Sequence, residues 1–129
     1  MIRFLLVSMT GWLAVFSVGV ETALPYIIRN TLRPGLRLRV RMWPHFWLGY
    51  ALVALILAHT SFVMGPAMAR SDATGIWAAT LALGVLFLQV GLGLVLKGGA
   101  SNTLQLRRWH FWSMIILIAL LLIHIWRNG

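Results

Sequence analysis

The segment that decides the fold is Trp43-Pro44-His45-Phe46-Trp47, with the apolar run that follows it to Ala58-His59-Thr60. The same plan returns near the C-terminus, where Trp109-His110-Phe111-Trp112 begins an apolar run that reaches His124. These are the four histidines of the chain, and in each pair the second follows the first by 14 residues. The chain therefore carries two histidine pairs of equal spacing, each within a hydrophobic segment.

The spacing has a direct meaning on a helix. Fourteen residues rise about 21 Å and turn to within roughly 40° of a whole number of turns, so both histidines of a pair share nearly one face. One lies toward each side of a hydrocarbon core about 30 Å thick. If the two helices run parallel, His45 faces His110 at one level and His59 faces His124 at the other. We expect each facing pair to supply two axial imidazoles to the iron of one haem b, held without cysteine attachment.

Four apolar stretches place the chain in a membrane. Of its 129 residues 60% are hydrophobic and 10% charged, and the mean hydropathy is +0.88, too apolar for so small a water-soluble domain. Each stretch is close to the ~20 residues that span a bilayer as a helix. The predicted fold is an all-α integral membrane four-helix bundle, one domain over residues 1–129, with two haems stacked between the second and fourth helices. The predicted helices cover about Phe4–Leu24, Pro44–Met64, Gly75–Leu96 and Trp109–Trp126.

The net charge of +9 is better explained by membrane orientation than by nucleic-acid binding. Eight basic residues fall in the two loops on one side: Arg29, Arg33, Arg37, Arg39, Arg41, Lys97, Arg107 and Arg108. The other side has three: Arg3, Arg70 and Arg127. This asymmetry predicts cytoplasmic basic loops and both termini outside, as in a bacterial inner membrane. The second and fourth helices then run in parallel, as the histidine argument requires.

The absence of cysteine and the isolation of the histidines narrow the metal chemistry. Without cysteine the chain makes no disulfide, no CxxCH haem attachment and no iron–sulfur ligation. Two imidazoles at each level are too few for a tetrahedral zinc site, and no soft ligand accompanies them. A lone histidine in a membrane helix is often a hydrogen-bond partner or a proton relay. Four with matched spacing favour six-coordinate haem iron.

An internal repeat of 65 residues links the two halves of the chain. It maps Trp12 to Trp77, Gly19 to Gly84, His45 to His110 and His59 to His124, and Ala54, Leu55 and Leu57 to Ala119, Leu120 and Leu122. We therefore expect two helical hairpins of the same plan, each contributing one histidine pair.

Several other residues are candidates for the same site. Glu21 is expected to pair with a loop arginine or, alternatively, to take a proton from a quinol. Gln89 is a candidate donor to a haem edge or a quinone carbonyl, with interhelix hydrogen bonding as the ordinary alternative. Gly49, Gly84 and Gly91 leave room for a large planar ligand or a close helix. The candidate partners of haem propionates are Arg41, Arg107 and Arg108 on the cytoplasmic side and Arg70 and Arg127 on the outer side.

The helix boundaries carry further expectations. Glu21-Thr22-Ala23 is a poor cleavage site, so the first apolar stretch is expected to be a retained helix rather than a signal peptide. Pro25 should end or kink it. Within the loop of residues 30–43, apolar residues alternate with arginines from Leu36 to Met42, which indicates an extended segment. Gly99–Leu106 is expected to be a short polar loop.

On these residues the chain resembles the di-haem b-type cytochromes of respiratory and photosynthetic membranes. The resemblance covers nearly the whole chain and rests on the four histidines and on Gly49, Gly84 and Gly91. It implies a four-helix core with paired histidines on the second and fourth helices. The larger cytochromes b continue with further helices and a Pro-Glu-Trp-Tyr quinol-site motif that this chain lacks, so the resemblance is to a small electron-carrying subunit.

The expected function is electron transfer across the membrane, between a quinone pool or partner redox subunit and a second partner. Two imidazoles fill the axial positions of each iron, which favours electron transfer over oxygen chemistry. The alternatives are a quinone-linked oxidoreductase at the outer face, acting on superoxide for example, and a haem-bearing membrane anchor of a larger complex. Lipid, other redox subunits and quinone are the expected partners.

Overall fold

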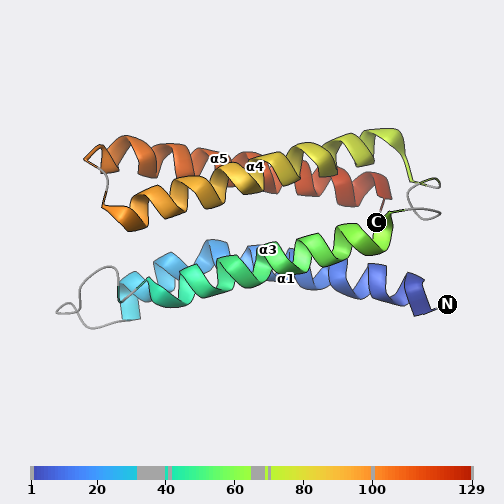
Figure 1. Ribbon diagram of the computed structural model, residues 1–129, viewed down its shortest axis with the longest axis horizontal. Coiled ribbons are helices and arrows are strands. Elements are labelled where there is room, and N and C mark those ends of the chain that lie inside the picture. The colour runs from blue at the N-terminus through green and yellow to red at the C-terminus, as the bar shows by residue number, and fades with distance from the viewer. Residues whose placement is uncertain are drawn as a thin grey trace. The chain divides into compact units, whose positions relative to one another are not determined.

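Four long helices make up nearly all of the described chain. The computed structural model describes residues 2–31, 40, 42–64, 69, 71–99 and 101–128. The helices are α1 (Ile2–Thr31), α3 (Trp43–Val63), α4 (Ala73–Gly98) and α5 (Thr103–Asn128), and the described residues contain no strand (Figure 1). All four are long and apolar enough to cross a membrane. The prediction of an all-α membrane protein with four spans is confirmed.

The helices pack in sequential pairs. α1 packs against α3, and α4 packs against α5. The chain divides into two compact units, Met1–Met64 and Gly65–Gly129. We call the α1–α3 pair hairpin 1 and the α4–α5 pair hairpin 2. The boundary between them falls where the 65-residue repeat predicts it, and each hairpin carries one histidine pair.

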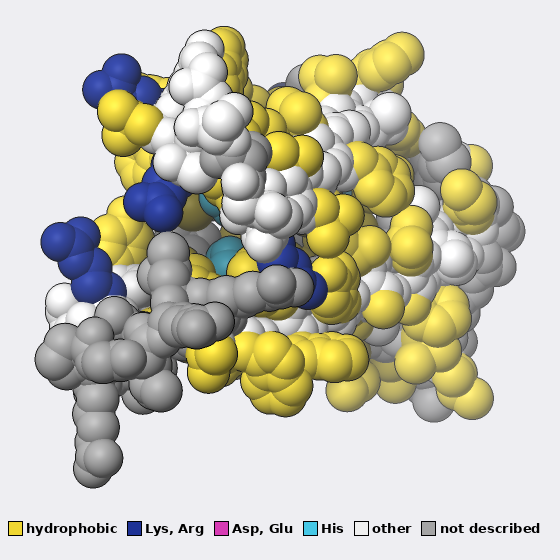
Figure 2. Space-filling model, turned by 60° about the vertical axis from the view of Figure 1, so that its left-hand side comes forward, with side chains coloured by type: hydrophobic (Ala, Val, Ile, Leu, Met, Phe, Trp, Pro, Cys, Tyr) yellow, Lys and Arg dark blue, Asp and Glu magenta, His cyan; other side chains and the backbone are white. Residues whose placement is uncertain are grey.

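Small side chains hold hairpin 2 together. Ala78, Ala82 and Leu86 of α4 are buried, as are Ser113 and Leu117 of α5. Small residues let two membrane helices approach closely, which favours van der Waals packing where lipid leaves little hydrophobic driving force. The large apolar side chains point outward instead, and in Figure 2 they cover much of the visible surface. Such a surface suits lipid and apolar partners better than water.

Local chemistry explains several helix ends. Pro44 lies in the first turn of α3, where its missing N–H costs nothing. Asp72 caps α4 because its side chain accepts a hydrogen bond from the backbone N–H of Gly75. Gly99 ends α4 with a left-handed φ of 83°, which favours glycine.

Two helices extend by several residues beyond their predicted ends, and α4 extends by two residues at each end. α1 continues through Pro25 to Thr31, because a membrane helix tolerates the one hydrogen bond that proline removes. α5 begins at Thr103 rather than Trp109, so the second half of the predicted polar loop is helical. Hydropathy marks where a helix enters the apolar layer and not where its backbone bonds begin. The predicted extended segment from Leu36 to Met42 lies almost wholly outside the described residues.

Candidate functional site

Each histidine pair lies on one unbroken helix, and both members turn toward the same neighbour. His45 and His59 of α3 contact residues of α1. His110 and His124 of α5 contact residues of α4. The prediction that the 14-residue spacing puts both rings on one face of each helix is therefore confirmed within each hairpin.

We call His59 and His124 the outer rings, and His45 and His110 the inner rings, after the predicted orientation. The outer ring of hairpin 1 is held by a hydroxyl. His59 Nδ1 lies 3.0 Å from Thr10 Oγ1, and Thr10 Oγ1 in turn donates its proton to the carbonyl of Leu6 at 2.6 Å. A hydroxyl has one proton to give, so in the contact with His59 it accepts, and the imidazole carries its proton on Nδ1. A Cβ at Gly11 would lie 3.1 Å from His59 Cε1, so this glycine leaves room for the ring.

The outer ring of hairpin 2 is held by the backbone. His124 Nδ1 lies 2.9 Å from the carbonyl oxygen of Gly75. A carbonyl oxygen only accepts, so His124 also carries its proton on Nδ1. Thr10 and Gly75 are separated by 65 residues and therefore occupy equivalent positions of the repeat. Both outer imidazoles thus have the same tautomer, in which Nε2 is the unprotonated ring nitrogen.

The inner ring of hairpin 1 meets a carboxylate. His45 Nδ1 lies 2.8 Å from Glu21 Oε1, and each of these side chains is only 17% exposed. A Cβ at Gly49 would lie 3.2 Å from the same oxygen. Gly49 was predicted to make room for a planar ligand, and in the structure it makes room for the carboxylate. Glu21, for which a loop arginine was the expected partner, contacts a histidine.

The inner ring of hairpin 2 is arranged differently. His110 Nε2, not Nδ1, faces the Gln89 side-chain amide nitrogen at 3.5 Å. The Ser113 hydroxyl donates to Gln89 Oε1 and lies 3.0 Å from the carbonyl of His110. Gln89 thus makes interhelix contacts, as the ordinary alternative for this residue predicted. For Nε2 of His110 to bind a metal, the Gln89 amide must turn aside.

The glycines near the rings are not all the predicted ones. A Cβ at Gly93 would lie 3.6 Å from His110 Cε1, so Gly93 is the glycine beside this ring. A Cβ at Gly84 or Gly91 would meet nothing within 4 Å in the described chain. Gly91 and Gly93 differ by about 200° around a helix, so they lie on opposite faces of α4. Thr10 and Ser113 were not among the predicted site residues.

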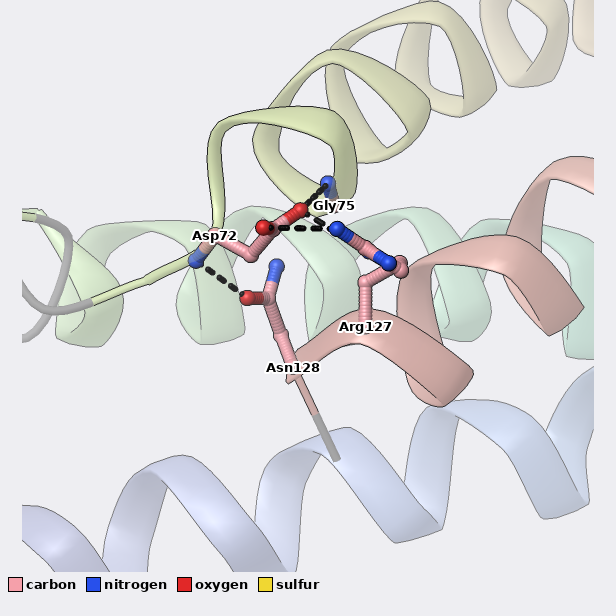
Figure 3. A network of polar contacts seen from close by, with 4 residues as sticks. All are labelled: Asp72, Gly75, Arg127 and Asn128. Atoms are coloured by element: carbon pink, nitrogen blue, oxygen red, sulfur yellow. Dashed lines mark hydrogen bonds and ion pairs between the residues drawn. The ribbon is translucent and has the colours of Figure 1, made fainter.

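The arginines have different surroundings. Arg107 and Arg108 are exposed in the first turns of α5, on the N-terminal side of His110. Arg41 and Arg70 lie outside the described residues. Arg127 is engaged by Asp72 through two contacts, Nε to Oδ1 at 3.0 Å and Nη2 to Oδ2 at 2.9 Å (Figure 3).

The Asp72 contacts tie the start of α4 to the end of α5. Besides Arg127, Asp72 caps Gly75 at 3.2 Å, and its backbone N–H donates to Asn128 Oδ1 at 2.7 Å (Figure 3). The hydrogen bond from Arg127 is the main cause that lowers the pKa of Asp72 from 3.8 to about 2. We call Asp72, Gly75, Arg127 and Asn128 the outer clamp. Asp72 was not among the predicted site residues.

Comparison with known proteins does not place the chain in a family: no family model, curated protein or solved structure matches it. The described residues contain no group of three or more His, Cys, Asp or Glu side chains that could hold a metal ion. A haem iron with two axial imidazoles needs only one pair. The donor set fits that requirement, because three of the four rings place Nδ1, and not Nε2, beside an oxygen of the neighbouring helix.

Proposed function

We propose that this chain is a di-haem b-type cytochrome subunit of a membrane redox complex. In this proposal it carries electrons across the membrane between a quinone pool or partner redox subunit and a second partner. His45 and His110 hold the cytoplasmic-side haem, and His59 and His124 hold the outer one. Haem supplies one-electron chemistry at an iron whose axial positions the imidazoles fill.

The observation that carries the proposal is the shared anchoring of the imidazoles. A metal-binding histidine usually donates its other ring N–H to a carboxylate, carbonyl or similar acceptor, which fixes the tautomer and orients the ring. Glu21, Thr10 and the Gly75 carbonyl stand at that position for His45, His59 and His124. For His59 and His124 the two acceptors, Thr10 and Gly75, occupy equivalent positions of the two hairpins, so this anchoring is repeated in the chain.

The proposed location is a bacterial inner membrane with both termini outside. Lys97 at the end of α4 and Arg107 and Arg108 near the start of α5 lie at the same end of hairpin 2. Basic residues favour the cytoplasmic side, so this end is the proposed cytoplasmic end. Arg107 and Arg108 remain proposed partners of the inner haem's propionates. Lipid is the proposed partner of the exposed apolar surface.

The alternative of a quinone-linked oxidoreductase at the outer face gains no support from the described residues. It required a basic outer surface at Arg70 and Arg127. The Arg127 guanidinium is occupied by Asp72, and Arg70 lies outside the described chain. Glu21 and Gln89, the candidate quinone contacts, both face imidazoles. The electron-carrying subunit is therefore the function that we retain.

Haem content tests the proposal. The protein purified in detergent should show a reduced b-type absorption spectrum and two haems per chain. His59→Ala and His124→Ala should each lose one haem, the outer one, because one axial imidazole is removed. His45→Ala and His110→Ala should each lose the other haem. The measurement is haem stoichiometry by pyridine haemochrome together with potentiometric titration, which separates the two haems.

Thr60→Val provides the matched control. Thr60 follows His59 directly, and its hydroxyl bonds the carbonyl of Ile56 within the same helix. This variant should keep both haems. A colourless, folded wild-type protein would contradict the proposal. Loss of the same haem in His45→Ala and His59→Ala would contradict the assignment of the two levels.

A further inference from the structure

The inner histidines of the two hairpins have partners of different charge. His45 meets the Glu21 carboxylate at 2.8 Å, whereas His110 meets the Gln89 amide at 3.5 Å. The repeat places Leu86 where hairpin 1 has Glu21, and Leu86 is buried at 4% exposure. Gln89 lies three residues further, about one helical turn along α4. Relative to hairpin 1, the polar partner of the inner histidine in hairpin 2 lies one helical turn further along and is uncharged.

Glu21 is an acidic residue within an apolar helix. The chain has only two acidic residues, and the other, Asp72, is neutralised by Arg127. An ionisable side chain within a membrane helix is costly and is rare without a role. Glu21 Oε2 is buried and has no hydrogen-bond partner among the described residues. The carboxylate is therefore directed at His45 and is not shared with an arginine of the described chain.

The surrounding backbone makes space for this contact. A Cβ at Gly49, one turn beyond His45, would lie 3.2 Å from Glu21 Oε1, closer than most real contacts. Pro25 lies four residues after Glu21 in α1, so the carbonyl of Glu21 lacks the helical N–H that would otherwise bond it. The missing side chain at Gly49 and the missing backbone N–H at Pro25 thus both lie near the Glu21–His45 contact.

We propose that Glu21 is a positioning residue for His45 and lowers the reduction potential of one haem only. This inference rests on the proposed di-haem function. The carboxylate lies 2.8 Å from Nδ1 of His45, and its charge at that place orients the ring and increases the electron donation of the ring to iron. A negative charge beside the ligand also favours the more positive, oxidised iron. The outer haem has only a hydroxyl and a carbonyl at the corresponding places, so an electron shared between the two haems is biased toward the outer one.

Glu21→Gln tests the proposal because it keeps the shape and removes the charge. The purified holoprotein is titrated potentiometrically, with the two haems followed by absorption and by low-spin EPR. We expect both haems to remain and one potential to rise, with a change of about tenfold in its one-electron equilibrium constant, or ~59 mV. The other potential should stay at its wild-type value. Removal of such a partner typically costs 10–100-fold in metal-site affinity or activity, so Glu21→Ala should also weaken retention of that haem.

Two further variants make the test specific. Thr22→Val is the control, because the Thr22 hydroxyl bonds the carbonyl of Val18 in its own helix, and both potentials should be unchanged. Gly49→Ala displaces the carboxylate without removing it and should raise the same potential by less; it carries the test if Glu21→Gln does not fold. Two haems with unaltered potentials, or with equal shifts, in Glu21→Gln would overturn the role of Glu21 and leave the di-haem function standing. A wild-type protein without haem would overturn the function itself.

Discussion

At the scale of single residues, the informative feature is which ring nitrogen of each histidine contacts the neighbouring helix. His59 and His124 contact an acceptor through Nδ1, one a hydroxyl and the other a backbone carbonyl. His45 directs the same atom at a carboxylate. The two hydrogen-bonded contacts favour a proton on Nδ1 of His59 and His124, and the contact with Glu21 orients the ring of His45.

Thr10→Val should weaken the outer haem site. Valine has the shape of threonine but cannot accept the Nδ1 proton of His59, so the ring loses its anchor and a polar group is left unsatisfied. We expect haem to leave that site about tenfold faster, measured as transfer to an excess of a haem-scavenging globin. Thr80→Val is the control, because the Thr80 hydroxyl bonds only the carbonyl of Ile76 in its own helix. Equal rates in the two variants would argue against a role for Thr10.

The helix face on which the histidines lie could be predicted from the sequence, but the residues that contact their rings could not. The 14-residue spacing fixes the face of the helix that carries both rings, because it depends on one helix alone. The residue opposite each ring depends on the register between two helices, which packing sets. This is why Thr10 and Ser113 were not predicted. The repeat contains one signal for these partners, because it relates Thr10, which contacts His59, to Gly75, which contacts His124.

At the scale of elements, the two hairpins differ in the polar contacts that join their helix ends. There the outer clamp joins the first turn of α4 to the last turn of α5. The repeat puts Val7 and Phe62 of hairpin 1 at the places of Asp72 and Arg127, so hairpin 1 has no equivalent ion pair there. The polar clamp therefore stabilises one hairpin and not its counterpart.

Asp72→Asn should reduce the acid sensitivity of the fold. The pKa of Asp72 is lowered to about 2 in the folded chain, so its stabilising effect is full above its usual value of 3.8 and is lost as the pH falls through about 2. We expect the wild-type thermal midpoint, followed by circular dichroism in detergent, to fall more between pH 4 and pH 2 than that of the variant. Asparagine still caps a helix, so α4 keeps its start.

Asp72→Ala separates the two roles of this residue. Alanine removes the cap as well as the ion pair, so its midpoint should be lower than that of Asp72→Asn across the whole pH range. The same acid response in wild type and Asp72→Asn would mean that the Asp72–Arg127 pair does not contribute to stability. The exposed position of the pair makes a modest effect the expectation.

The helix ends show where prediction from hydropathy stops. The existence of all four helices follows from their apolar length, which is a property of the sequence alone. α1 and α5 extend beyond their apolar stretches because backbone hydrogen bonding continues into polar sequence. Pro25 did not end α1, since the surrounding apolar segment leaves the chain no better alternative than helix.

At the scale of the whole molecule, the proposal depends on α3 and α5 crossing the membrane in the same direction. The absence of native cysteine allows a direct test with single-cysteine variants at exposed positions near the helix ends: Asn30→Cys, Ala69→Cys and Ser101→Cys. Asn30→Cys and Ser101→Cys should react with an impermeant maleimide from the cytoplasmic side. Ala69→Cys should react only from the opposite side. Labelling of Asn30→Cys and Ser101→Cys from opposite sides would leave the histidines without shared levels and would end the proposal.

The two outer histidines also differ in how their anchors can be inherited. The hydroxyl that holds His59 is written in a codon, and one base change can erase it. The carbonyl that holds His124 belongs to the main chain, so no single side chain encodes it; a Cβ at position 75, however, would collide with Asn128 and lie 3.1 Å from Arg127 Cβ. Replacement of Thr10 therefore removes the first anchor directly, whereas replacement of Gly75 disturbs the second only by displacing its neighbours.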